Sequence, residues 1–361
     1  MKHLLLCLIT VFTVAATHGQ QFHKRYGSPY FDRARKVIQT RDGNYLVVGE
    51  TNGFGSAGNA FITKVDAQGS ILWTKDYSGI NPDDVRDIIE LPDRNLVMCG
   101  LTYSYGMGGS DGYVMKTDSI GNFIWGKTYG SISGECFIKI HEDGEHGFYV
   151  AGIGAKSSTL GGIVLLRMDG GGTVAWGKLL TNWQALGDWL PVDITPLTSG
   201  GVVLCGASPS GYGATLWKFS PTGNLTWSKE YDTSPKGSGV VGFSVLENNK
   251  GEILVNYAFA NSNTIAESVD NCILKLDASG NYISNTTYGG TYDDLCRTIS
   301  NTGDGGVLIC GFTNSAGNGD YDAALIKLLA DGSVEWAKVY GTAWGENTAS
   351  ALQTADGGFI L

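Results

Sequence analysis

Apolar and polar residues alternate in short runs along most of the chain, and the same runs return about every 51 residues. In one copy, the alternation predicts four strands, at Val85–Leu91, Leu96–Leu101, Tyr113–Thr117 and Asn122–Tyr129. Glycine-rich or acidic residues separate the runs, as at Asp42-Gly43 and at 66–69, and such residues are typical of hairpin turns. Each copy therefore predicts four antiparallel strands, which we name A to D in chain order.

Three side-chain positions mark the repeat most clearly. A basic residue in strand C is followed by a tryptophan and then by a tyrosine in strand D, with few exceptions. The basic position holds Lys64, Lys116, Arg167, Lys218, Lys275 and Lys327; the tryptophan position holds Trp73, Trp125, Trp176, Trp227, Ser284 and Trp336; the tyrosine position holds Tyr77, Tyr129, Leu180, Tyr231, Tyr288 and Tyr340. The tryptophan and tyrosine lie on one face of strand D, and we expect that face to pack between neighbouring copies.

A period of this length with four strands per copy predicts a β-propeller. We expect an all-β, seven-bladed β-propeller of four-stranded antiparallel blades, near residues 28–78, 79–130, 131–181, 182–232, 233–289, 290–341 and 342–361. The last copy stops inside strand B, whereas Phe22, Lys24 and Tyr26 match a strand D. We therefore expect the last blade to be incomplete and closed by the N-terminal strand at 21–27, and the natural chain to continue beyond Leu361.

The first 19 residues read as a secretory signal peptide, with a basic start at Lys2 and an apolar run from Leu4 to Ala16. Residues 20–361 then form the single propeller domain. No other apolar run approaches the roughly 18 residues of a membrane helix, so we expect a secreted or cell-surface monomer that does not span a membrane. A net charge of −10 argues against nucleic acid as a partner.

Three of the cysteines, Cys99, Cys205 and Cys310, occupy the same repeat position, each before a glycine. Equivalent positions in different blades of a propeller lie too far apart to form disulfides. We therefore expect small buried thiols, and the lack of a C-x-x-C pair gives no indication of a redox or metal site.

The hairpin at 64–73, with Asp66, Gly69 and Trp73, resembles the tryptophan-docking motif of quinoprotein-type propellers. The whole unit also resembles uncharacterised secreted bacterial β-propeller repeat proteins, which often carry a C-terminal secretion and sorting domain. This resemblance covers nearly all of the mature chain and implies quinoprotein-like blades. It leaves a quinone-dependent enzyme as one alternative for the function.

The candidate ligand face lies at one mouth of the channel, because strand A is innermost in a propeller. Acidic residues stand five places after the glycine of each D–A turn, at Asp32, Asp84, Glu135, Asp294 and Glu346, with Asp188 in the fourth copy. Each could cap its own loop, or together they could hold a cation. The same face should carry aromatic loop residues, namely Tyr30, Tyr292, Trp344, Tyr103 and Tyr105. Loops at 109–111 and 318–322 could bind calcium.

No catalytic motif of the metalloprotease, serine-hydrolase or phosphate-binding kind occurs in the sequence. Our preferred hypothesis is therefore an extracellular or cell-surface binding module for a protein, glycan or cation. The alternatives are a glycan-processing enzyme that uses the channel-mouth carboxylates, a quinone-dependent enzyme, and a purely structural scaffold. We expect no cofactor, with calcium as an open alternative.

Overall fold

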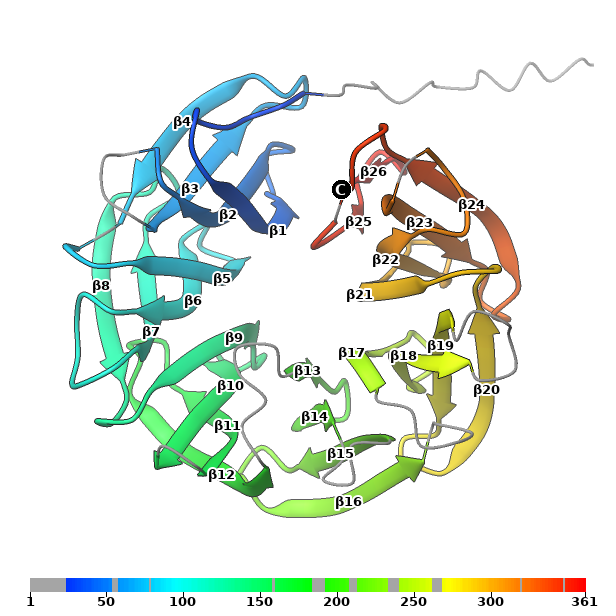
Figure 1. Ribbon diagram of the computed structural model, residues 1–361. Helices are drawn as coiled ribbons and strands as arrows, with labels where there is room; N and C mark the ends of the chain where they lie inside the picture. The colour runs from blue at the N-terminus through cyan, green and yellow to red at the C-terminus, as the bar shows by residue number, and fades with distance from the viewer. Residues whose placement is uncertain are drawn as a thin grey trace, which may run out of the picture.

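The computed structural model describes residues 24–361, except for 54–57, 78, 158–159, 184–191, 208–212, 233–239, 262–267, 319 and 347. In this part of the chain the strands form six four-stranded antiparallel sheets and one two-stranded sheet. The sheets stand as blades around a central axis, with the first strand of each blade innermost and the fourth outermost (Figure 1). None of the described residues forms a helix with the length and apolar character needed to cross a bilayer.

The strands follow the repeat. Their bounds are β1 Asp32–Gln39, β2 Tyr45–Thr51, β3 Asn59–Val65 and β4 Ile71–Asp76 in blade 1; β5 Asp83–Glu90, β6 Leu96–Thr102, β7 Asp111–Thr117 and β8 Phe123–Tyr129 in blade 2; β9 Glu135–Glu142, β10 Phe148–Ser157, β11 Leu160–Met168 and β12 Val174–Trp183 in blade 3; β13 Val192–Pro196, β14 Val202–Ala207, β15 Gly213–Phe219 and β16 Leu225–Asp232 in blade 4; β17 Val240–Glu247, β18 Ile253–Asn261, β19 Ser268–Leu276 and β20 Tyr282–Tyr288 in blade 5; and β21 Asp294–Asn301, β22 Val307–Thr313, β23 Asp322–Leu328 and β24 Val334–Tyr340 in blade 6. The four strands predicted in the second copy are confirmed, each to within two residues at either end.

The prediction of seven four-stranded blades is wrong. After blade 6, the described chain adds β25 (Leu352–Gln353) and β26 (Phe359–Ile360), which pair only with each other. The N-terminal residues 24–31 contain no strand, so they do not complete this sheet, and residues 1–23 lie outside the described part. The physical reason is that a strand D must hydrogen-bond to a strand C about 4.8 Å away. Within the described residues β26 has no strand C beside it, so the N-terminal segment has no neighbouring edge to join.

The two-stranded sheet nevertheless joins blade 6 to blade 1 by the contacts that join other neighbours. Its turn donates the Ala355 N–H to Oε1 of Gln39 at the end of β1, at 2.7 Å. The equivalent bond runs from Gly303 of blade 6 to Gln353 of the two-stranded sheet, also at 2.7 Å. Phe359 also packs edge-on against Trp336 of blade 6. The first and last described segments of the chain are therefore in direct contact.

The outer edges of the blades are held by a repeated contact, which we call the tyrosine latch. The strand D tyrosine donates its hydroxyl hydrogen to the glycine carbonyl in the C–D turn of the next blade. The latches are Tyr77 to Gly121 at 2.5 Å, Tyr231 to Gly280 at 2.6 Å, Tyr288 to Gly332 at 2.7 Å, and Tyr129 to Gly172. Tyr26 makes the same bond to Gly69 of blade 1 at 2.5 Å, although it belongs to no strand.

The latch glycine also receives the tryptophan of the preceding blade. A Cβ added at Gly121 would stand 2.7 Å from the Tyr77 hydroxyl and 3.2 Å from the Trp73 ring, and the residue has a φ of +80°. Both the contact and the backbone conformation therefore require glycine at this turn. The prediction that the tryptophan face packs between neighbouring copies is confirmed.

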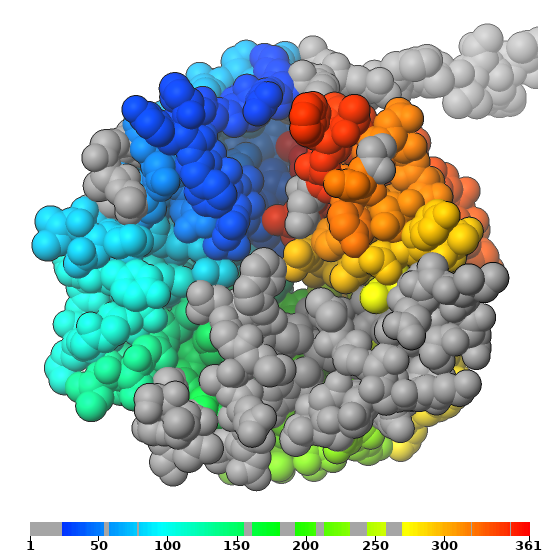
Figure 2. All heavy atoms as spheres, viewed as in Figure 1, coloured from blue at the N-terminus to red at the C-terminus, as the bar shows by residue number. Residues whose placement is uncertain are grey.

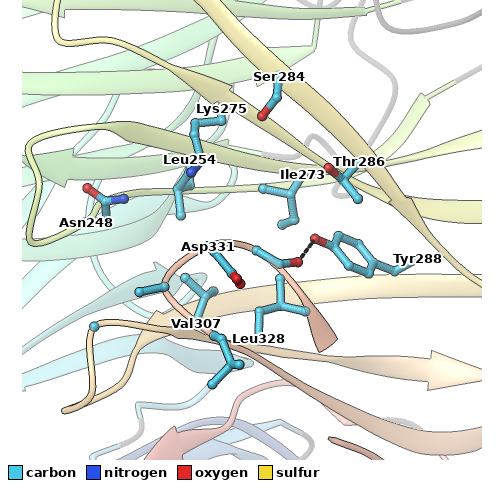
Figure 3. A pocket seen from close by; sticks show the side chains of 14 residues that line it. Asn248, Leu254, Ile273, Lys275, Ser284, Thr286, Tyr288, Val307, Leu328 and Asp331 are labelled. Carbon is cyan, nitrogen blue, oxygen red and sulfur yellow. Dashed lines mark hydrogen bonds between the residues drawn. The ribbon is translucent and has the colours of Figure 1, made fainter. Parts of the chain in front are cut away.

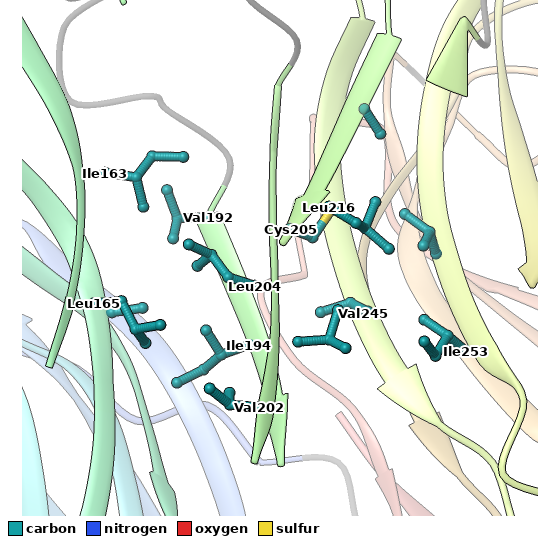
Figure 4. Packing of buried hydrophobic residues seen from close by; sticks show 14 of the residues in the cluster. Ile163, Leu165, Val192, Ile194, Val202, Leu204, Cys205, Leu216, Val245 and Ile253 are labelled. Carbon is teal, nitrogen blue, oxygen red and sulfur yellow. The ribbon is translucent and has the colours of Figure 1, made fainter. Parts of the chain in front are cut away.

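The core lies between adjacent blades, where aliphatic side chains of neighbouring sheets interdigitate. Figure 4 shows this packing across blades 3, 4 and 5, with Leu165, Ile194 and Val245 all buried. Cys205 belongs to the same cluster (Figure 4). All six cysteines of the described chain are buried and none forms a disulfide, which confirms the prediction of core thiols.

One interface lacks its tryptophan. Ser284 occupies the tryptophan position of blade 5, and a crevice of about 40 Å³ opens there between blades 5 and 6 (Figure 3). A Cβ added at Gly332, the latch glycine of blade 6, would meet only the Tyr288 hydroxyl, at 3.8 Å. The crevice is therefore the space that the missing indole would otherwise fill.

Candidate ligand-binding face

The predicted channel-mouth carboxylates fold back onto their own D–A loops. Each of them accepts the backbone N–H of the residue four places earlier. The bonds are Ser28 to Asp32 at 2.6 Å, Ser131 to Glu135 at 2.8 Å, Gly290 to Asp294 at 2.6 Å and Thr342 to Glu346 at 2.9 Å. Burial alone would raise the pKa of Asp32, but hydrogen bonds from Thr51 and Ser28 outweigh it and lower the pKa. These four carboxylates cap loops, which was one of the two predicted alternatives.

In blade 2 the loop-capping residue is Asp83 and not Asp84. Asp83 accepts the Gly79 N–H at 2.8 Å and pairs across the sheet with Thr102, as Asp32 pairs with Thr51. The glycine of this turn stands one place later than in blade 1, after Tyr77 and Ser78, so counting from it points one residue too far. Asp188, the predicted member in blade 4, lies outside the described residues.

A second carboxylate accompanies some of these loop caps. Asp111, at the start of β7, lies beside Glu135, because one oxygen of each is within 2.7 Å of the position of a Cβ on Gly130. Burial and then the nearby Glu135 raise the pKa of Asp111. At the end of blade 6, Asp322 lies against Gly341 and its side chain forms a hydrogen bond with Glu346. The sequence analysis did not pair these residues, although an aspartate that opens strand C in both copies was a usable signal.

The loops predicted to bind calcium are closed by backbone hydrogen bonds. Asp111 accepts the Met107 N–H at 2.9 Å, and Asp322 accepts the Asn318 N–H at 2.7 Å. Within the described ranges, no group of three or more histidine, cysteine, aspartate or glutamate side chains is arranged to hold a metal. Calcium binding at 109–111 or 318–322 stays a prediction.

The predicted aromatic residues are strongly exposed, and we call them the aromatic rim. Tyr30, Tyr103, Tyr105, Tyr292 and Trp344 expose between 49% and 81% of their surface, with Trp344 the most exposed. They lie in the loops before β1, between β6 and β7, before β21 and before β25. Large aromatic side chains gathered at one end of a fold are unusual unless they meet a partner.

A group of arginines, which the sequence analysis missed, lies at the same end of the innermost strands. Arg35, Arg86 and Arg297 each occupy a β-bulge, where the register with strand B shifts in β1, β5 and β21. A bulge re-aims the extra side chain away from the regular alternation. Together with Arg33 we call them the arginine cluster. Their common repeat position, five residues before the first residue of the A–B turn, was a signal that could have revealed them.

Three members of the arginine cluster share two carboxylates. Asp84 is 2.8 Å from Arg35 and 2.6 Å from Arg86, and Glu50 is 3.2 Å from Arg35. Arg33, which is more exposed, contacts the same Glu50 at 3.1 Å. Within this group three arginines therefore share two carboxylates, while loop-capping carboxylates such as Asp32 and Asp83 lie at the same mouth.

Arg297 adds a fourth positive charge from blade 6. Burial lowers the pKa of Arg297, and the charges of Arg35 and Arg33 lower it further, although Cys296 opposes them. The guanidinium lies over the Phe312 ring, 5.3 Å from its centre, which fixes the side chain in place. The positive charges of blades 6 and 1 therefore act on each other at the channel.

The next position along strand A is electrically balanced. Lys36 lies 4.0 Å from Asp87, and Lys139 lies 3.4 Å from Asp193. Burial would lower the pKa of Lys139, but Asp193 and Asp87 raise it overall. In this deeper part of the wall each of these lysines therefore has a carboxylate partner.

No known family model matches the chain, and no curated protein matches it. Among solved structures, the chain is similar to a protein of unknown function from Bacteroides caccae, at 13% identity and a TM-score of 0.51 over 84% of this chain and 96% of that one. It is also similar to the polysaccharide lyase Uly1 (10% identity, TM-score 0.52, 91% and 85% covered). A third match is the α-L-arabinofuranosidase Arb93A from Fusarium graminearum (12%, 0.50, 83% and 96%). At these identities, the likenesses show an all-β propeller fold alone.

Proposed function

We propose that the protein is an extracellular or cell-surface binding module that takes a glycan at the end of the propeller carrying the aromatic rim. The observation that carries the proposal is the exposure of these five aromatic side chains on loops of one face. Sugar rings present C–H faces that pack on aromatic rings, and polar groups beside those rings fix orientation. The secreted location rests on the predicted signal peptide at 1–19.

The shape of the molecule supports a ligand at this place. Figure 2 shows the ring recessed at its centre, between the blue atoms of blade 1 and the yellow and orange atoms of blade 6. Tyr30 precedes β1, and Tyr292 and Trp344 precede β21 and β25. A ligand in the recess would therefore have aromatic side chains from the loops beside it.

A glycan array with the purified protein tests this proposal. We expect binding to a limited set of glycans. Trp344→Ala should lower the affinity about 10-fold or more, because an exposed indole contributes to ligand binding and little to the packing of the fold. Trp344→Ala should unfold at the same temperature as the natural sequence. Binding to no glycan, or binding that Trp344→Ala leaves unchanged, would exclude this face as the glycan site.

A second candidate function is glycan processing, and the raised pKa of Asp111 beside Glu135 favours it. A carboxyl group with a raised pKa can serve as a general acid, and paired carboxyls are the usual machinery of glycoside hydrolysis. Asp111 is only 2% exposed, however, and its carboxylate is held by the loop. Incubation with each bound glycan, followed by product analysis, tests it; cleavage lost in Asp111→Asn would favour the enzyme.

A further inference from the structure

The arginine cluster is a charged site built from three blades. Its members lie on β1, β5 and β21, which are innermost strands on neighbouring sides of the channel (Figure 1). The bulges that carry Arg35, Arg86 and Arg297 all fall in the first half of strand A, close to the loops of the aromatic rim. The blades therefore bring guanidinium groups together from residues that are more than 200 positions apart in sequence.

Folding alone does not explain this grouping. Bringing like charges together costs free energy. Burial is the main reason that the pKa of Arg297 is lowered, and the charges of Arg35 and Arg33 lower it further. Asp84 and Glu50 offset part of it, since each contacts two arginines. Arg33, Arg35 and Arg86 share these two acids, so a carboxylate supplied by a ligand would give the exposed Arg33 side chain a partner of its own.

The residue type indicates which anion. Arginine presents a planar fork of N–H donors that matches a carboxylate through two parallel hydrogen bonds. The Arg297 guanidinium lies over the Phe312 ring, whereas the Arg33 side chain is 44% exposed and lies over Phe31, 4.9 Å from the ring centre. One guanidinium is thus fixed and another is accessible at the same mouth.

We propose that the arginine cluster binds the carboxylate of an acidic glycan, a chain of uronic acid units, whose sugar rings pack on the aromatic rim. This inference rests on the proposed glycan binding and names the charge of the ligand. The two parts of the site have separate tasks: the aromatic rim holds the sugar rings, and the arginine cluster selects their carboxylates. Neutral glycans would contact only the aromatic rim.

Isothermal titration with pentagalacturonate and with its methyl ester tests the inference, because the two probes share one sugar chain and the ester lacks the ionised carboxylates. We expect the acid to bind about 10-fold or more tightly than the ester, and its affinity to fall as salt rises. Arg33→Gln and the double variant Arg35→Gln with Arg297→Gln should each lose this preference. Arg41→Gln, which removes an exposed arginine from the A–B turn at the other end of β1, is the matched control and should keep it.

The outcomes separate this inference from the proposed function. Equal affinity for acid and ester would overturn carboxylate recognition and leave glycan binding intact. Binding of neither probe, with no hit on the glycan array, would overturn both. If the double variant does not fold, Arg33→Gln decides alone, because the exposed Arg33 side chain can be replaced with little effect on packing; an unchanged preference in that variant would contradict the inference.

Discussion

The outer edges of the blades and the channel mouth differ in how regularly their side chains recur from blade to blade. At the outer edges, the same tyrosine latch, tryptophan and turn glycine recur from blade to blade. At the mouth, equivalent bulges hold arginine in blades 1, 2 and 6 but Ile138 in blade 3. A contact that every interface needs must repeat, whereas a single ligand needs its groups on one side only. The comparison therefore assigns stability to the repeating positions and recognition to the others.

At the outer edges, the largest loss of stability should come from Trp176→Ala. The indole donates to the Pro221 carbonyl at 2.9 Å and packs beside Tyr149 and Phe219. Removing it should lower the free energy of unfolding by about 3 to 5 kcal/mol. Urea denaturation measures this loss. Glycan affinity, measured at a temperature where the variant is folded, should not change; a large loss of affinity would contradict the division of tasks.

At the mouth, Asp84→Asn should separate stability from recognition. The change leaves Arg35 and Arg86 without their shared carboxylate and should cost about 2 kcal/mol of stability. It also makes the mouth more positive, so affinity for pentagalacturonate should rise several-fold. A thermal melt and a titration on the same sample give both values. Weaker binding together with lower stability would contradict the arginine cluster as the anion site.

The tyrosine latch predicts a loss of stability in alkali. Burial raises the pKa of Tyr129 and of Tyr231 to about 12, from an ordinary value of 10.0. Because the folded state holds these protons more tightly, their contribution is complete below pH 10 and is lost as the pH rises through about 12. Tyr129→Phe should cost about 1 kcal/mol at neutral pH and should lose less stability across that window. Urea denaturation at pH 8, 10 and 11.5 tests both; identical slopes would contradict the latch.

The smallest expected effect is a gain in stability at the interface between blades 5 and 6, where Ser284 occupies the tryptophan position. Ser284→Trp should fill the crevice between blades 5 and 6 and place an indole on Gly332, as Trp227 lies on Gly280. We expect about 1 kcal/mol of added stability from the buried apolar surface. Ser284→Ala, which leaves the crevice open, is the control. A lower melting temperature for the tryptophan variant would show that blade 5 has adapted to serine.

The sequence predicted the repeating strands and the faces between blades well, because residues close together in the sequence determine them. Alternation located the strands, and the recurring Trp and Tyr located the faces between blades. The number of blades was wrong because a two-stranded last copy offers no strand C for the N-terminal segment to pair with. The sequence analysis already placed the end of that copy inside strand B, but it took the N-terminal segment to complete the blade.

The channel mouth was predicted only in part. The exposed aromatic loops were found, since loop position and residue type suffice for that prediction. The carboxylates were found too, but Asp84 was one residue out of place because the turn glycine is displaced in blade 2. The arginine cluster was missed, because which side chain of strand A bulges toward the mouth depends on the register with strand B. That register is a property of the folded sheet.

The most direct test of this account is a crystal structure of the protein with pentagalacturonate. We predict a sugar carboxylate within hydrogen-bonding distance of Arg33, Arg35 or Arg297, and a sugar ring against a residue of the aromatic rim such as Trp344. Ligand bound along the outer strands, with the arginine cluster making no contact to it, would contradict the account.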